Sequence, residues 1–209
     1  MQQDDLSAIQ TDALSQNLVR AIERFVRVLN EQAGEKHAAK VILEGAVLHG
    51  EELEQKPERF IEEKLIGPVM EVLGYEPRFQ PTGFKGLDGR YPDFTALNLD
   101  TTNFGEVKKP GKIENARKES FEYLTMATDR PIVGIATDGF VWILHTATKP
   151  GEQPTYTHHV ALHDLFKKIR LEQTQPKAER RSRTHLRELS QDFVKQFSRD
   201  HIEELNLSE

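Results

Sequence analysis

The order of the apolar segments between residues 57 and 145 constrains the fold of this chain more than any other feature of its sequence. These segments show either the helical or the strand-like repeat of apolar residues. In chain order they are a helix at 57–73, strands at 92–99 and 103–109, a helix at 112–128, and strands at 132–137 and 140–145. A chain that alternates helices with pairs of strands buries its apolar surface by packing helices on a sheet. We therefore predict an α/β fold with a mixed central sheet flanked by helices.

Local turn residues mark where several of these segments begin and end. Pro57 suits the first turn of the first helix, and Gly74 suits its end. The pair Asp138-Gly139 separates the last two strands and is typical of a β-hairpin. Residues 80–90 are rich in Gly and Pro, which predicts a loop.

Segments outside this core are predicted to be largely helical. Amphipathic helices are expected at 5–33 and 180–205, and their apolar residues recur at helical spacing. These residues are Leu18, Ile22, Phe25 and Leu29 in the first helix, and Leu186, Leu189, Phe193 and Phe197 in the last. We expect the two apolar stripes to pack on the core or on each other. The alternative is that the last helix binds another domain or a second copy of the chain.

The predicted organisation has three parts. Residues 1–50 form an N-terminal helical extension, 51–172 the core, and 173–209 a linker with the last helix. Within the core, 156–162 is expected to add a short strand and 163–172 a helix. The stretch 40–49 fits either a helix or a strand.

Composition narrows the class of protein. The 209 residues include no cysteine, so disulfides and thiolate metal sites are excluded. No apolar run approaches the length of a membrane span, and the first residues do not resemble a signal peptide, so we expect a cytoplasmic protein. The formal net charge is −6, so binding to nucleic acid would require a local basic patch or metal ions.

Charged residues occur where strands are otherwise apolar. Asp93 opens the first predicted strand, and Glu106 and Lys108 are two residues apart in the second, which places them on one face. The preceding helix adds Glu58 and Glu62, of which we favour Glu58 as a member of the same site. The alternatives are that Glu106 and Lys108 form a surface pair, and that Glu58 only complements the helix dipole.

Two carboxylates and a lysine are suited to phosphodiester hydrolysis. Mg²⁺ prefers oxygen ligands and keeps several waters, so Asp93 and Glu106 could hold it, with Mn²⁺ as a substitute. Such an ion polarises the phosphate and lowers the pKa of a bound water. Lys108 could orient that water or stabilise developing negative charge.

Tyr91-Pro92-Asp93, followed after twelve residues by Glu106-Val107-Lys108, resembles the motif of the PD-(D/E)XK nuclease superfamily. Over residues 57–146 the chain is similar to the endonuclease domain of type I restriction motor subunits and related fused restriction enzymes. The resemblance includes Glu58 in the first helix, the helix 112–123 and the hairpin around Asp138-Gly139.

This resemblance implies a magnesium-dependent endonuclease that cleaves double-stranded DNA to restrict foreign DNA. It implies catalytic roles for Asp93, Glu106, Lys108 and Glu58. The Gln-x-x-x-Tyr feature of the family falls on Glu119 and Tyr123, where Glu replaces Gln. The sequence contains no Walker motor motif and no methyltransferase motif, so further domains or subunits would supply those functions and target recognition.

Three basic residues near the motif, Lys85, Arg90 and Lys109, are candidates for DNA contact. A basic stretch from Lys177 to Arg187 could also contact phosphates, or simply form a solvated helix start. Two rival functions remain open: a nuclease-like module that binds DNA or protein without cleavage, and a nuclease acting on RNA or repair intermediates.

Three histidines, His158, His159 and His163, could suggest a metal site because two of them are four residues apart. No fourth ligand is apparent. We therefore interpret them as polar residues at a strand-to-helix junction.

Overall fold

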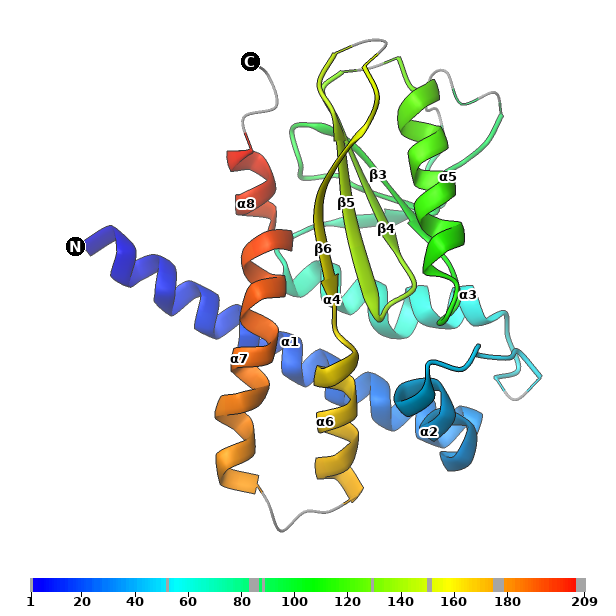
Figure 1. Cartoon of the computed structure of the whole chain (residues 1–209), viewed down its shortest axis with the longest axis vertical. Coiled ribbons are helices and arrows are strands. Elements are labelled where there is room, and N and C mark those ends of the chain that lie inside the picture. The colour runs from blue at the N-terminus through cyan, green and yellow to red at the C-terminus, as the bar shows by residue number, and fades with distance from the viewer. Residues whose placement is uncertain are drawn as a thin grey trace.

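The computed structural model describes residues 2–51, 53–82, 87, 89–128, 130–149, 152–174 and 179–205, with backbone only for 2–7 and 179–182. Its helical elements are α1 (Gln2–Ala33), α2 (Glu35–Glu44), α3 (Pro57–Ile61), the π-helical turn η1 (Glu62–Ile66), α4 (Gly67–Val72), α5 (Ile113–Met126), α6 (His163–Thr174), α7 (Glu179–Phe197) and α8 (Arg199–Glu204). Its strands are β1 (Pro77–Phe79), β2 (Phe94–Ala96), β3 (Thr102–Val107), β4 (Ile132–Thr137), β5 (Val141–Ala147) and β6 (Thr155–Ala161). Figure 1 shows their arrangement.

The six strands form one mixed sheet in the order β1-β2-β3-β4-β5-β6. Only β3 and β4 pair in parallel, and α5 connects them; every other neighbouring pair is antiparallel. The predicted α/β class and mixed sheet are therefore confirmed. The predicted hairpin between β4 and β5 and the short strand β6 are present as well. The strand β1 was not predicted, and the stretch 40–49 resolves into the end of α2 and a connecting segment.

Helices cover both faces of the sheet. On one face, α5 packs on β3, β4 and β5 (Figure 1). The other face is covered by α1, the α3–α4 segment, α6 and α7, and these elements enclose the main apolar core. Alternate residues of the central strands point to opposite faces of the sheet. Val133 and Trp142 belong to the main core, whereas Ala136 and Ile143 face α5.

The helix predicted at 57–73 is interrupted by the π turn η1. Pro68 is the physical reason. It has no N–H to donate to the carbonyl four residues earlier, and its ring would collide with that carbonyl. The preceding turn therefore widens, and Gly67 N–H bonds to the carbonyl of Glu62. At the far end, the N–H groups of Gly74 and Tyr75 bond to the carbonyls of Glu71 and Met70, the Schellman pattern expected of a C-terminal glycine.

The last predicted helix is also broken, at Ser198. The hydroxyl of Ser198 caps the start of α8 by accepting from His201 N–H. Backbone groups at the break bond to another part of the fold: Arg199 N–H donates to the carbonyl of Leu73 (2.9 Å), and the Tyr75 hydroxyl donates to the carbonyl of Phe197 (2.9 Å). These tertiary hydrogen bonds replace those that an unbroken helix would have made.

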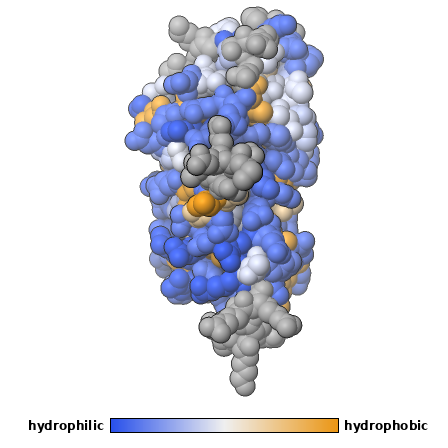
Figure 2. All heavy atoms as spheres, turned by 90° about the vertical axis from the view of Figure 1, so that its left-hand side faces the viewer, coloured by the Kyte–Doolittle hydropathy of each residue, from blue (hydrophilic) through white to orange (hydrophobic). Residues whose placement is uncertain are grey.

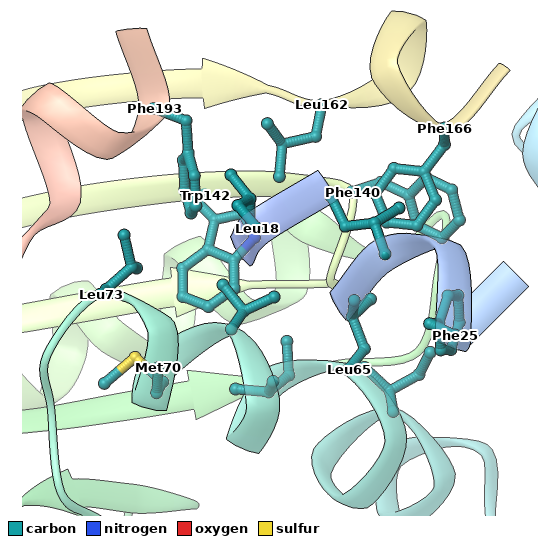
Figure 3. Packing of buried hydrophobic residues seen from close by; sticks show 14 of the residues in the cluster. Leu18, Phe25, Leu65, Met70, Leu73, Phe140, Trp142, Leu162, Phe166 and Phe193 are labelled. Carbon is teal, nitrogen blue, oxygen red and sulfur yellow. The ribbon is translucent and has the colours of Figure 1, made fainter. Parts of the chain in front are cut away.

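Both terminal apolar stripes are buried inside the molecule, as one of our two alternatives predicted. The residues of the N-terminal stripe share one cluster with Leu186, Phe193 and Phe197, and Leu189 packs against it. Phe193 lies edge-on to the Trp142 ring at a centroid distance of 5.3 Å (Figure 3). Phe197 is also edge-on to that ring, at 6.2 Å. The outer face that carries α7 and α8 is mostly hydrophilic, with small separate apolar patches (Figure 2).

Candidate active site

Asp93 lies immediately before β2 and is held against β3 by both its backbone and its side chain. Its N–H donates to the carbonyl of Gly105 (2.9 Å), and its Oδ2 accepts a hydrogen bond from Val107 N–H (2.7 Å). The close approach of β2 to β3 at this point requires glycine at position 105, because a Cβ there would lie 1.9 Å from Cζ of Phe94. The Phe94 ring is buried, so a larger residue would push β2 away from β3. The carboxylate of Asp93 is thereby directed to the C-terminal end of β3.

Glu106 and Lys108 extend from this end of β3 on the same side, as their spacing predicted. Lys108 Nζ contacts Glu106 Oε1 and lies 2.9 Å from Oε2 of Glu119 on α5. Glu106 is only 2% exposed, so the alternative of a surface pair is wrong. The structure thus brings Asp93, Glu106, Lys108 and Glu119 into one group.

Burial gives the acids of this group unusual proton affinities. It raises the pKa of Glu106 to about 9, and the neighbouring carboxyl groups of Glu119 and Asp93 add to the rise. Burial also raises the pKa of Asp93, against the opposing effects of its hydrogen bond from Val107 and the charge of Lys108. By itself, burial would lower the pKa of Lys108. The contacts with Glu106 and Glu119 outweigh this effect and raise it, so the ammonium group stays charged at neutral pH.

These features suit a divalent cation. Oε2 of Glu106 is buried and has no hydrogen-bond partner in the described part of the chain, although buried carboxylate oxygens are normally paired. The raised pKa values of Asp93 and Glu106 come mainly from burial, and a cation bound between these groups would favour their ionised forms. Within the described residues, no group of three or more acidic, histidine or cysteine side chains is arranged as a metal cage. Mg²⁺ does not need one, because one or two carboxylates with water and substrate oxygens commonly suffice.

The helix acid that interacts with Asp93 in the structure is Glu62. Burial raises the pKa of Glu62 to about 7, and the charge of Asp93 is the next cause. Glu62 is the first residue of the π turn, which changes the direction of the side chains that follow α3. The charge of Asp93 therefore acts on Glu62, and our preference for Glu58 as the site member stays a prediction. Glu58 is half-buried and acts on the Glu62 carboxyl.

A pocket of about 230 Å³ opens beside Glu62, and it is lined by Arg59, Glu63, Phe79 and Gln80 as well. Gln80 has a positive φ of 51°, and its N–H donates to the carbonyl of Asp93 (2.7 Å). The sequence offered no signal for this contact, because it depends on the pairing of β1 with β2. Gln80 thus fixes the backbone of Asp93 from the side opposite β3.

Glu119 and Tyr123 play different parts. Glu119 binds the Lys108 ammonium, and its pKa is lowered because its hydrogen bonds to Glu106 and Lys108 outweigh the effect of burial. Tyr123 is buried, with its ring edge-on to Phe104 at 5.6 Å. Burial raises its pKa to about 12, so it stays neutral. Glutamate in place of the expected glutamine at 119 therefore gives the lysine a second carboxylate partner.

The predicted DNA-contacting residues have mixed outcomes. Lys85 lies outside the described residues. Arg90 is exposed, and its guanidinium forms an ion pair with Glu122 of α5 (2.9 Å). Lys109 is half-exposed, one residue beyond Lys108. Their role in DNA binding stays a prediction.

The junction histidines do not gather into one site. His163 begins α6 and its ring packs near that of Phe140 (5.5 Å). His158 instead meets His201 of α8. The interpretation of His163 as a residue of the strand-to-helix junction agrees with this placement.

Comparisons with known protein families, with curated proteins and with solved structures give no match. In the described part of the chain, no helix is long and apolar enough to cross a membrane. Any functional conclusion therefore rests on the sequence, on the fold and on the geometry of this site.

Proposed function

We propose that this protein is a magnesium-dependent nuclease of the PD-(D/E)XK type. One observation carries the proposal: Asp93, Glu106 and Lys108 converge at the ends of two neighbouring strands, in a buried and acid-rich position. The alternation of helices and strands around them also agrees with that class. Exposed ion pairs contribute little to stability, and a group of buried acids beside a lysine with perturbed pKa values favours a functional role.

The roles of the residues follow from their chemistry. Asp93 and Glu106 would hold Mg²⁺, with Mn²⁺ as a substitute. When bound, such an ion polarises a phosphate oxygen and lowers the pKa of a coordinated water. Lys108 places a permanent positive charge beside these carboxylates, where it can orient a water molecule and stabilise negative charge on the phosphate. Glu119 holds that ammonium in position, and Glu62 adds negative charge near Asp93.

We further propose double-stranded DNA as the substrate and restriction of foreign DNA in the cytoplasm as the setting. The support is the sequence resemblance across residues 57–146. Target recognition, translocation and methylation would then belong to other domains or subunits of a restriction system.

The direct test is a nicking assay on supercoiled plasmid DNA. We expect open-circular and linear products with Mg²⁺ or Mn²⁺, and none in excess EDTA. Equal cleavage in EDTA would contradict the metal requirement. DNA binding without cleavage under either ion would instead indicate a non-catalytic binding module, and cleavage of RNA alone would change the substrate class.

The helix acids provide a finer test of the same site. Above the Glu62 pKa of about 7, we expect Glu62→Gln to reduce Mg²⁺-dependent cleavage by about tenfold or more, because it removes negative charge that would help to hold the ion near Asp93. Glu58→Gln, on the same helical segment, is the matched variant and should have a smaller effect. Rates measured at several Mg²⁺ concentrations would decide the order. A larger loss in Glu58→Gln would support the preference drawn from the sequence.

A further inference from the structure

Two histidines from distant parts of the chain meet at an edge of the sheet. His158 belongs to β6 and His201 to α8, and their Nε2 atoms are 3.2 Å apart, with ring centroids separated by 5.2 Å. In the strand order, β6 lies at one end, with β4 and β5 between it and β3. The pair is therefore separate from the acids at the end of β3.

We propose that His158 and His201 together bind a divalent transition-metal ion such as Zn²⁺. Zinc bonds to histidine nitrogen at 2.0–2.1 Å, so two nitrogens in tetrahedral coordination lie about 3.3 Å apart. The observed separation of 3.2 Å matches this spacing. Both rings direct the same atom, Nε2, to the space between them. An ion placed there can bond to both nitrogens without movement of the backbone.

A pocket beside the pair gives an ion access to both rings. A pocket of about 600 Å³ is lined by both histidines together with Asp200, Glu204, Lys195 and Gln10, among others. Asp200 is already paired with Arg199 (3.2 Å) and accepts a hydrogen bond from Gln10 (2.9 Å), which leaves Glu204 as the other carboxylate of the lining. Glu204 lies three residues after His201 and so shares its face of α8. No third side chain in the described residues is positioned as a ligand, so water from the open pocket would complete the coordination.

The ligand chemistry separates this site from the one at β3. Imidazole nitrogen suits Zn²⁺, Ni²⁺ and Cu²⁺, whereas Mg²⁺ prefers oxygen. The inference thus does not depend on the proposed nuclease function.

An ion bound by His158 and His201 would link the outer strand of the sheet to the last described helix. An ion held by both elements stabilises the folded state over the unfolded chain.

Zinc titration of the intact protein tests the proposal. By isothermal titration calorimetry with ZnCl₂ we expect one site in the wild type, weakened at least tenfold in His158→Ala and in His201→Ala. Zinc should also raise the melting temperature of the wild type and leave that of both variants unchanged. His159→Ala is the matched control, because neighbouring residues of a strand face opposite sides. A second control is His37→Ala, which disrupts another close histidine pair, with ring centroids 5.7 Å apart.

Several outcomes would overturn the proposal: no zinc binding by the wild type, unchanged binding in both histidine variants, or loss of the site in His37→Ala. Displacement of Zn²⁺ by an equal concentration of Mg²⁺ would also contradict a nitrogen site. Circular dichroism without zinc checks that the variants fold. If an alanine variant is unfolded, His158→Gln and His201→Gln retain a polar side chain and provide the same comparison.

Discussion

Alanine at Asp93, Glu106 or Lys108 is expected to reduce Mg²⁺-dependent DNA cleavage by at least about a hundredfold, because a single preorganised electrostatic contribution to such a reaction is commonly worth that much. Each variant removes a different part of the site. Asp93→Ala and Glu106→Ala remove the two carboxylates that would hold the ion, and Lys108→Ala removes the positive charge beside them. The measurement is the initial rate of plasmid nicking across a range of Mg²⁺ concentrations.

A control and a second substitution make this result specific. Lys167→Ala removes an exposed lysine from α6, a helix on the face of the sheet opposite α5, and we expect it to cleave as the wild type does. Asp93→Asn keeps the size of the side chain and removes its charge, so it should be as inactive as Asp93→Ala. Wild-type cleavage by the Lys108 variant would remove the role assigned to that residue. Full activity in all three alanine variants would contradict the proposed site.

The double substitution Phe193→Ser/Phe197→Ser is expected to cause the largest loss of stability. Both rings are fully buried against Trp142, and truncating one buried phenylalanine commonly costs about 3–5 kcal/mol. Burying serine hydroxyls adds a further cost. Because the stripe packs internally, the melting temperature should fall sharply while the molecular mass measured by light scattering stays unchanged.

Milder changes keep this test interpretable if the double variant does not fold. Phe197→Leu should lower the free energy of unfolding by about 1 kcal/mol. Leu171→Ser, on an exposed position of α6, should leave it nearly unchanged. A dimeric wild type and a monomeric, equally stable Phe193/Phe197 variant would show instead that the last helix is an interface.

Much of the fold could be predicted because its signals are local. The hairpin between β4 and β5 depends on Asp138-Gly139 and two apolar runs, and the buried faces of α1 and α7 depend on helical spacing. The strand β1 escaped prediction because three residues, Pro77-Arg78-Phe79, are too few to show a period. Its conformation depends on pairing with β2. The break at Ser198 escaped for a similar reason, since Leu73 and Tyr75 provide the hydrogen bonds that make it possible.

For the candidate site, the sequence by itself determined the shared face of Glu106 and Lys108 and the place of Asp93 at the start of the neighbouring strand. The two-residue period of a strand places Glu106 and Lys108 on one face. The short turn between β2 and β3 makes these strands neighbours, which brings Asp93 close to the end of β3. Only the tertiary structure decided that Glu119 reaches Lys108 and that the charge of Asp93 acts on Glu62. Those contacts depend on how α5 and the π turn pack on the sheet, and the rotation of a helix against a sheet is set by packing of distant residues rather than by the spacing within either segment.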